Sequence, residues 1–203
     1  MAASVDVRTR APSVEIMKDQ VAWAADLART LLERPLPRRW AHTQGVAEQA
    51  RNLAPMLGDD AGLVEAAAWL HDIGYSPDLV DTGFHPLDGA RYLSDSEHAD
   101  DVMCRLVAHH TNALGEAAER GLADHLVREF PPARPDLLDA LTYCDMTTSP
   151  NGNRVHVRER IAEILTRYDP DHVVSRTIRR SVPDHLATAA RVECRRLVLA
   201  ATG

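Results

Sequence analysis

Apolar residues recur every three or four positions along most of the chain, the spacing of one face of an α-helix. No segment alternates apolar and polar residues as a half-buried strand would, and no internal repeat is visible. We therefore predict an all-α fold. The expected helices run over residues 13–33, 38–57, 60–71, 86–94, 99–110, a short stretch within 114–134, 136–147, 155–167, 170–180 and 183–201.

The helices fit one domain, because 203 residues suffice to bury a sizeable core. We expect residues 1–12 to be a flexible tail and residues 13–203 to form a single helical domain. Within it, residues 38–148 carry the candidate site described below, and additional helices follow over 153–203.

The composition argues against several partners. A net charge of −7 and an aromatic content of 4% disfavour a nucleic-acid polymer, whose binding relies on cations and stacking. There is no apolar run long enough to span a membrane and no signal peptide, and the 3 cysteines form no CxxC pair, so a cytoplasmic protein is expected.

Basic residues are concentrated at the C-terminal end, where residues 154–203 hold 10 arginines against 6 acidic residues. This excess could attract a small anionic, phosphorylated partner. Solvated helix faces explain it more simply, and a homodimer contact or a lid is a further alternative.

One polar pair interrupts an apolar stretch. The run Ala66-Ala67-Ala68-Trp69-Leu70 leads directly into His71-Asp72, and Ile73-Gly74-Tyr75 follows. An unpaired buried carboxylate costs several kcal/mol at least, so Asp72 needs a strong partner. The dipeptide alone is expected about once by chance in a chain of this composition. Its meaning therefore depends on other polar residues at helix ends or on inner faces, which are His42, His85, His109, His110 and Asp145.

Imidazole and carboxylate groups without thiolates suit Fe, Mn, Co or Zn better than a structural zinc site. Two ions about 3.5–4 Å apart would use roughly this number of ligands, with a carboxylate bridging them, and would favour phosphoester hydrolysis. The alternative is a buried histidine–carboxylate hydrogen-bond network. For His85, capping the helix that begins at Pro86 is a second alternative.

The order His42, His71-Asp72, Asp145 resembles the HD-domain superfamily of metal-dependent phosphohydrolases. The runs His85-Pro86-Leu87-Asp88-Gly89-Ala90 and Val107-Ala108-His109-His110 are similar to the subset with a dinuclear centre. The resemblance covers roughly residues 38–148 and implies a helical bundle that holds two divalent ions, Fe or Mn, with Co, Zn, Ni or Mg as alternatives. It implies His42, His71, Asp72 and Asp145 as ligands of one ion, Asp72 as the bridge, and His85 with His109, His110 or both at the other.

The chain departs from the family pattern at Tyr75, where many members have a phosphate-binding lysine. We therefore expect arginine to contact phosphate. The candidate substrate-binding residues are Arg39, Arg91 and Tyr75 itself. Asp78 and Asp81 are candidate general acids, although both could be ordinary loop residues.

The leading functional prediction is hydrolysis of a small phosphoester, most often a nucleotide in this family, with Asp72 in the catalytic centre. The alternative is a di-iron oxygenase acting on a small polyol or phosphonate. A non-catalytic metal-binding regulatory domain is the second alternative.

Overall fold

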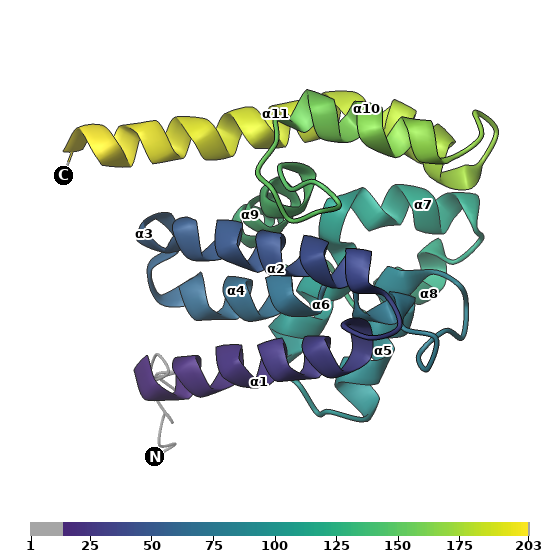
Figure 1. Ribbon diagram of the computed structural model, residues 1–203, viewed down its shortest axis with the longest axis horizontal. Coiled ribbons are helices and arrows are strands. Elements are labelled where there is room, and N and C mark those ends of the chain that lie inside the picture. Colours follow the sequence, from purple (N-terminus) through teal and green to yellow (C-terminus); the bar gives the residue numbers. More distant parts are fainter. Residues whose placement is uncertain (1–13, 203) are drawn as a thin grey trace, which may run out of the picture.

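The structure, a computed structural model, describes residues 14–202, and helices dominate it (Figure 1). Within this range there is no β-strand, only an isolated bridge between Thr148 and Arg154. The all-α prediction is confirmed. The predicted tail, residues 1–12, lies outside the described residues.

The α-helices are α1 (Val14–Leu32), α2 (Pro37–Asn52), α3 (Ala54–Leu57), α4 (Ala61–Leu70), α5 (His85–Asp95), α6 (Asp101–His109), α7 (Ala113–Glu119), α8 (Ala123–Glu129), α9 (Pro135–Met146), α10 (Val157–Arg167) and α11 (Val173–Thr202). Short 3-10 turns are η1 (Gly58–Asp60), η2 (Ile73–Tyr75) and η3 (His110–Asn112).

Helix α4 is the centre of the bundle and lies between α1 and α2 (Figure 1). Six of its ten residues are buried, and four of these six are glycine or alanine. Small side chains allow neighbouring helices to approach closely, and a helix that is apolar on most sides belongs in a core. The last turn of α4 therefore delivers His71 and Asp72 to the interior of the protein.

The C-terminal helices cover one side of this bundle. Helix α11 packs against α9, α10 and α7 and extends along the whole molecule (Figure 1). The prediction of two helices, 170–180 and 183–201, is wrong, because α11 continues through Pro183. A proline inside a helix removes a hydrogen bond to the carbonyl four residues earlier, which is that of Arg179. Both Arg179 and Pro183 are exposed, so water can satisfy that carbonyl while packing of the flanking turns maintains the helix.

No helix within residues 14–202 has both the length and the apolar character needed to cross a bilayer.

Candidate metal centre

Five elements bring imidazole and carboxylate groups together in the core. His42 comes from α2, His71 and Asp72 follow α4, and His85 begins α5. His110 directly follows α6, and Asp145 lies in the last turn of α9. All are buried except His85, whose side chain is 15% exposed.

Two glycines permit the close packing that assembles this centre. A Cβ on Gly74 would lie 2.0 Å from the carbonyl oxygen of His85, so η2 and the start of α5 touch through their backbones. A Cβ on Gly45 would lie 2.2 Å from the carbonyl oxygen of Gly152. That second contact holds the loop after α9 against α2, where the Ser149 carbonyl meets His42. A larger residue at either position would separate elements that carry candidate metal-ligand side chains.

The polar groups form two triads that could each hold a metal ion. One contains His42, His71 and Asp145, and the other Asp72, His85 and His110; within each, the candidate ligand atoms lie within 4.8 Å of one another. Asp72 connects them, because its Oδ2 lies 3.2 Å from His71 Nε2 and its Oδ1 lies 3.4 Å from His85 Nε2. The arrangement is consistent with a dinuclear site.

Backbone carbonyls orient three of the histidines. Nδ1 of His42 donates to Ser149 O at 3.0 Å, Nδ1 of His71 to Ala68 O at 2.8 Å, and Nδ1 of His110 to Val107 O at 2.7 Å. A carbonyl can only accept, so the proton of each neutral ring lies on Nδ1. Nε2 of each ring therefore faces the centre, the orientation that histidine ligands of metals commonly have, and Nε2 of His42 lies 2.9 Å from Asp145 Oδ1.

The electrostatics keep the two carboxylates ionised. Burial raises the pKa of Asp72, but Arg39 and His71 outweigh this effect and hold the pKa well below its usual range. Burial acts in the same way on Asp145, where His42 and His71 bring the pKa well below normal. Ionised oxygens are the form that binds a cation.

Most of the histidines are held neutral. Burial lowers the pKa of His42, His85 and His110 despite the nearby carboxylates. His71 is the exception, since the Asp72 carboxylate outweighs burial and raises its pKa. Neutral imidazoles offer the lone pairs that metal ligation requires.

His71 supplies the most direct test of whether these residues fit a metal ion. Its Nε2 is buried and has no hydrogen-bond partner among residues 14–202, although Asp72 Oδ2 lies 3.2 Å away. A buried polar atom without a partner costs about 1–3 kcal/mol. A cation between the two triads would remove that cost, so the donor set fits a metal.

Other predicted residues lie elsewhere. His109 faces away from the triads, and its Nε2 donates to Phe130 O at 2.5 Å. Arg91 pairs with Glu129 at 2.7 Å and with Asp81 at 3.4 Å. Arg91, Asp81 and Asp78 line a separate surface pocket that contains no member of the triads.

Arg39 and Tyr75, in contrast, lie at the centre. Arg39 Nη1 donates to Asp72 Oδ2 at 2.7 Å, and its guanidinium lies 4.0 Å from the centroid of the Tyr75 ring. Tyr75 in turn stacks on His85 with ring centroids 3.9 Å apart.

The sequence analysis missed Arg160 and Thr111. The Arg160 side chain is 4% exposed, and its Nη2 lies 3.7 Å from Asp145 Oδ1. Its signal was present, because Arg160 shares the inner face of α10 with Val157, Ile161 and Ile164. The Thr111 hydroxyl donates to Asp145 Oδ2, and nothing in the sequence pattern indicated that contact.

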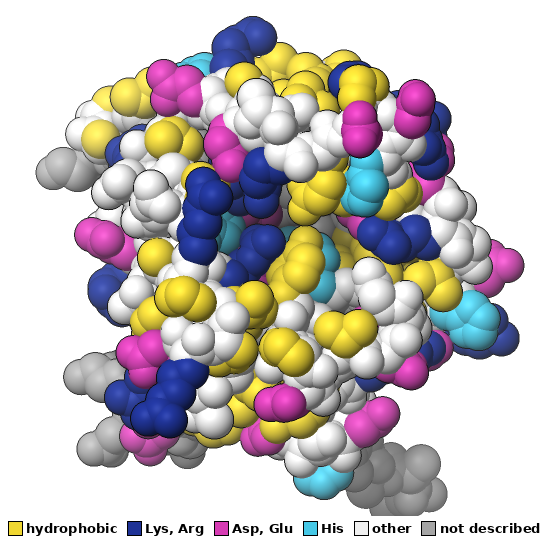
Figure 2. Space-filling model, turned by 45° about the vertical axis from the view of Figure 1, so that its right-hand side comes forward, with side chains coloured by type: hydrophobic (Ala, Val, Ile, Leu, Met, Phe, Trp, Pro, Cys, Tyr) yellow, Lys and Arg dark blue, Asp and Glu magenta, His cyan; other side chains and the backbone are white. Residues whose placement is uncertain are grey.

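Helices α10 and α11 close a small chamber over the triads. The cavity measures about 80 Å³, and its walls include Asp72, His85, His110 and Asp145 together with Ile164 and Ile178. Figure 2 shows dark blue arginine side chains gathered at a hollow in which cyan histidine is visible. The C-terminal helices, which lie beyond the region covered by the family resemblance, thus form part of the chamber wall.

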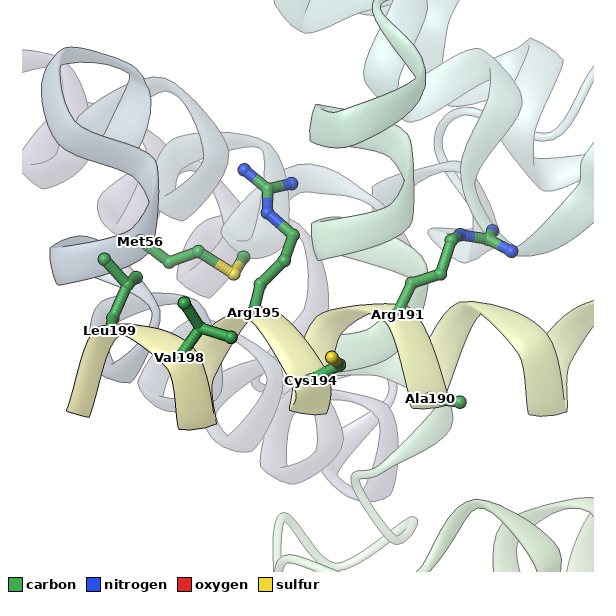
Figure 3. Close-up of a pocket in the computed structure, with 7 residues that line it drawn as sticks. All are labelled: Met56, Ala190, Arg191, Cys194, Arg195, Val198 and Leu199. Carbon is green, nitrogen blue, oxygen red and sulfur yellow. The ribbon is translucent and has the colours of Figure 1, made fainter. Parts of the chain in front are cut away.

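A larger groove of about 750 Å³ lies between α3 and the end of α11 (Figure 3). Ile178 borders the chamber and Ala190 borders the groove, so twelve helical residues, or about 18 Å, separate the two cavities along α11. The groove is lined mainly by apolar side chains such as Met56 and Leu199 (Figure 3). Arg191 and Arg195 also line it, and Arg191 pairs with Asp139 of α9 at 2.7 Å. It contains no cluster of acids or histidines and carries no chemistry related to the triads.

The sequence pattern of the HD domain matches residues 39–171, more than half of the chain. The chain belongs to the HD-domain family. This is the metal-dependent phosphohydrolase superfamily that the motif order indicated, and the match extends beyond the predicted region to include α10.

Curated relatives match over part of the chain. Ribonuclease Y of Thermoanaerobacter pseudethanolicus is 33% identical over 102 residues, which are 49% of this chain and 20% of that protein. Ribonuclease Y of Rhodopirellula baltica is 34% identical over 90 residues, or 44% of this chain and 15% of that protein. The chain thus spans only a small part of the length of these relatives. No solved structure shows a significant match.

Proposed function

We propose that the protein is a metal-dependent hydrolase of a small phosphoester. The observation that carries this proposal is the placement of Asp72, whose two oxygens face different triads. Two bound ions would lower the pKa of a coordinated water and neutralise charge on a phosphoryl group. The residues that would hold them are His42, His71, Asp72, His85, His110 and Asp145.

The placement of a cationic side chain supports a phosphoryl substrate. The family's lysine position is Tyr75 here, and the guanidinium of Arg39 lies over that ring. Arg39 could therefore take the place of the missing lysine, since a guanidinium binds phosphate through two parallel hydrogen bonds. Burial raises the pKa of Tyr75, so its hydroxyl stays protonated and can also donate to a phosphoryl oxygen.

The size of the chamber favours a small reacting group. About 80 Å³ is well below the roughly 300–1,000 Å³ of ordinary ligand pockets, so a phosphoryl group fits while the rest of the substrate must lie outside. The relatives named ribonuclease Y suggest RNA as a second substrate class to test. The net charge of −7 makes a small ester the better candidate.

The test combines metal content with a substrate panel. Purified protein should contain close to two equivalents of Fe or Mn by mass spectrometry and should hydrolyse members of a panel of nucleotides, other phosphomonoesters and RNA oligonucleotides. Asp72→Asn should lose metal and activity together, whereas Asp124→Asn, an exposed carboxylate on α8, should retain both.

The same panel run with and without O₂ separates the two enzyme classes. Equal hydrolysis under both conditions supports the proposal. Product formation that strictly requires O₂ would establish the oxygenase alternative, and a protein that binds metal but turns over nothing would favour the regulatory one.

A further inference from the structure

Three arginines stand between the chamber and a second cavity. The outer cavity measures about 300 Å³ and is bordered by the segment from Pro35 to Arg39 and by Pro150. Arg39, Arg160 and Arg167 line both cavities. These three side chains therefore form the boundary that the two cavities share.

Arg160 is buried with unused hydrogen-bonding capacity. Its Nη1 pairs with Glu163 at 2.7 Å, while its Nε has no hydrogen-bond partner within residues 14–202. A guanidinium that is 4% exposed is costly to bury unless its donors are satisfied. Arg160 nevertheless lines both cavities, so an anion bound there would give this buried guanidinium a further partner of opposite charge.

Arg167 is also paired with Glu163. Its Nε lies 3.1 Å from the other oxygen of Glu163, so one carboxylate pairs with two guanidinium groups. The pKa of Arg167 is lowered by burial and by the positive charges of Arg160 and Arg39. Glu163 thus fixes both arginines at the wall that the two cavities share, and a single carboxylate cannot neutralise both guanidinium groups.

We propose that Arg160 and Arg167 bind a second phosphate next to the one that is cleaved, so that the substrate ends in a diphosphate. The terminal phosphoryl group would occupy the chamber beside Arg39, and the adjacent phosphate would lie between the two arginines of α10. The remainder of the molecule would occupy the outer cavity. This assignment rests on the proposed hydrolase function and specifies its substrate class.

The reaction balances with water alone. A water oxygen forms a bond to the terminal phosphorus, and the bond from that phosphorus to the bridging oxygen breaks. The products are inorganic phosphate and an organic phosphate, and the protons of the water pass to the products and the solvent.

Binding of methylene diphosphonate, a diphosphate analogue that cannot be hydrolysed, and of inorganic phosphate tests the assignment by calorimetry on the full chain. Arg167→Ala should weaken diphosphonate binding about tenfold or more, as expected for charge-assisted hydrogen bonds, and should change phosphate binding less than about twofold. The matched control is Arg158→Ala, an exposed arginine on the same helix, which should change neither.

The assignment and the hydrolase proposal can fail separately. Diphosphonate binding that depends on Arg167 in a protein without hydrolase activity would support the assignment and refute the hydrolase. An active hydrolase in which Arg167→Ala affects both ligands equally, or neither, would overturn the assignment alone. Equal losses in Arg158→Ala and Arg167→Ala would indicate general charge attraction and would also overturn it.

Discussion

Gly74 and His85 meet backbone to backbone, since a Cβ at position 74 would lie 2.0 Å from the His85 carbonyl oxygen. Gly74→Ala should therefore push the start of α5 away and displace His85 from Asp72. We expect a loss of about 1–3 kcal/mol in unfolding free energy, the usual cost of overpacking, and loss of about one metal equivalent. Urea denaturation and metal analysis measure the two effects.

Gly115→Ala is the control for this substitution. Gly115 is exposed on α7, and a Cβ there would make only an ordinary contact of 3.5 Å with Thr177. Alanine is the better helix former, so stability should be unchanged or slightly higher. Full metal content in Gly74→Ala would contradict the role given to this close approach.

The members of the triads were predicted from local signals at some positions and from the motif order of the family resemblance at others. His71 and Asp72 interrupt an apolar helix, and Asp145 shares a face with Leu138 and Leu141. The approach of Gly74 to His85 could not be predicted, because it depends on how η2 and α5 pack together. Arg160 is different, because its place on the apolar face of α10 was a readable signal, but one that lies beyond the motif region that the resemblance covers.

The conformation of the loop before His85 could not be predicted from the sequence either. The buried carboxylate of Asp88 accepts hydrogen bonds from the backbone amides of Asp81, Thr82 and Gly83, which fixes the loop before His85. This folding leaves the Asp81 side chain exposed and paired with Arg91, away from the triads. Residue types alone made Asp81 a candidate acid, whereas the hydrogen bonds of Asp88 determine where it lies.

His109 and His110 should behave differently when replaced. His110→Ala removes a ring of the second triad and should reduce the metal content by about one equivalent. His109→Ala should retain both metal equivalents but leave the buried Phe130 carbonyl without its donor, at a cost of about 1–3 kcal/mol in stability. Metal analysis and urea denaturation of both variants check this. Metal loss in His109→Ala with retention in His110→Ala would reverse the assignment.

The metal-free protein should become less stable as pH falls below about 6.5, the ordinary pKa of histidine. Burial lowers the pKa of five histidines in the folded state, so the unfolded chain takes up their protons first. Each can reduce stability by at most about 1.4 kcal/mol per pH unit. The raised pKa of His71 has the opposite effect on stability, but it is one group against five. The five are His42, His85, His109, His110 and His185.

The carboxylates do not mask this trend. The lowered pKa values of Asp72 and Asp145 contribute stability above about pH 3.9, the ordinary pKa of aspartate, so their contribution is nearly constant from pH 5 to 8. The measurement is the urea midpoint of EDTA-treated protein at pH 8, 7, 6 and 5. A midpoint that is constant or rises between pH 7 and 5 would contradict the assignment of neutral buried histidines.

Arg39 is the main positive partner of Asp72 in the metal-free protein, at 2.7 Å from Oδ2. Arg39→Met keeps much of the side-chain volume but leaves a carboxylate that is 4% exposed without this cation. Breaking a buried pair by removing one partner costs about 3–5 kcal/mol, and partial exposure of Arg39 at 21% places the expected loss at the lower end.

Divalent metal should reverse most of this loss, because bound ions replace the missing positive charge beside Asp72. Arg39→Met is therefore expected to be strongly destabilised after EDTA treatment and close to wild type with Mn²⁺ added, as measured by urea denaturation under both conditions. Arg38→Met, an exposed neighbour on α2, should match wild type in both. If Mn²⁺ stabilises Arg39→Met no more than it stabilises wild type, then Asp72 and the ion do not interact, and the bridging role of this carboxylate is lost.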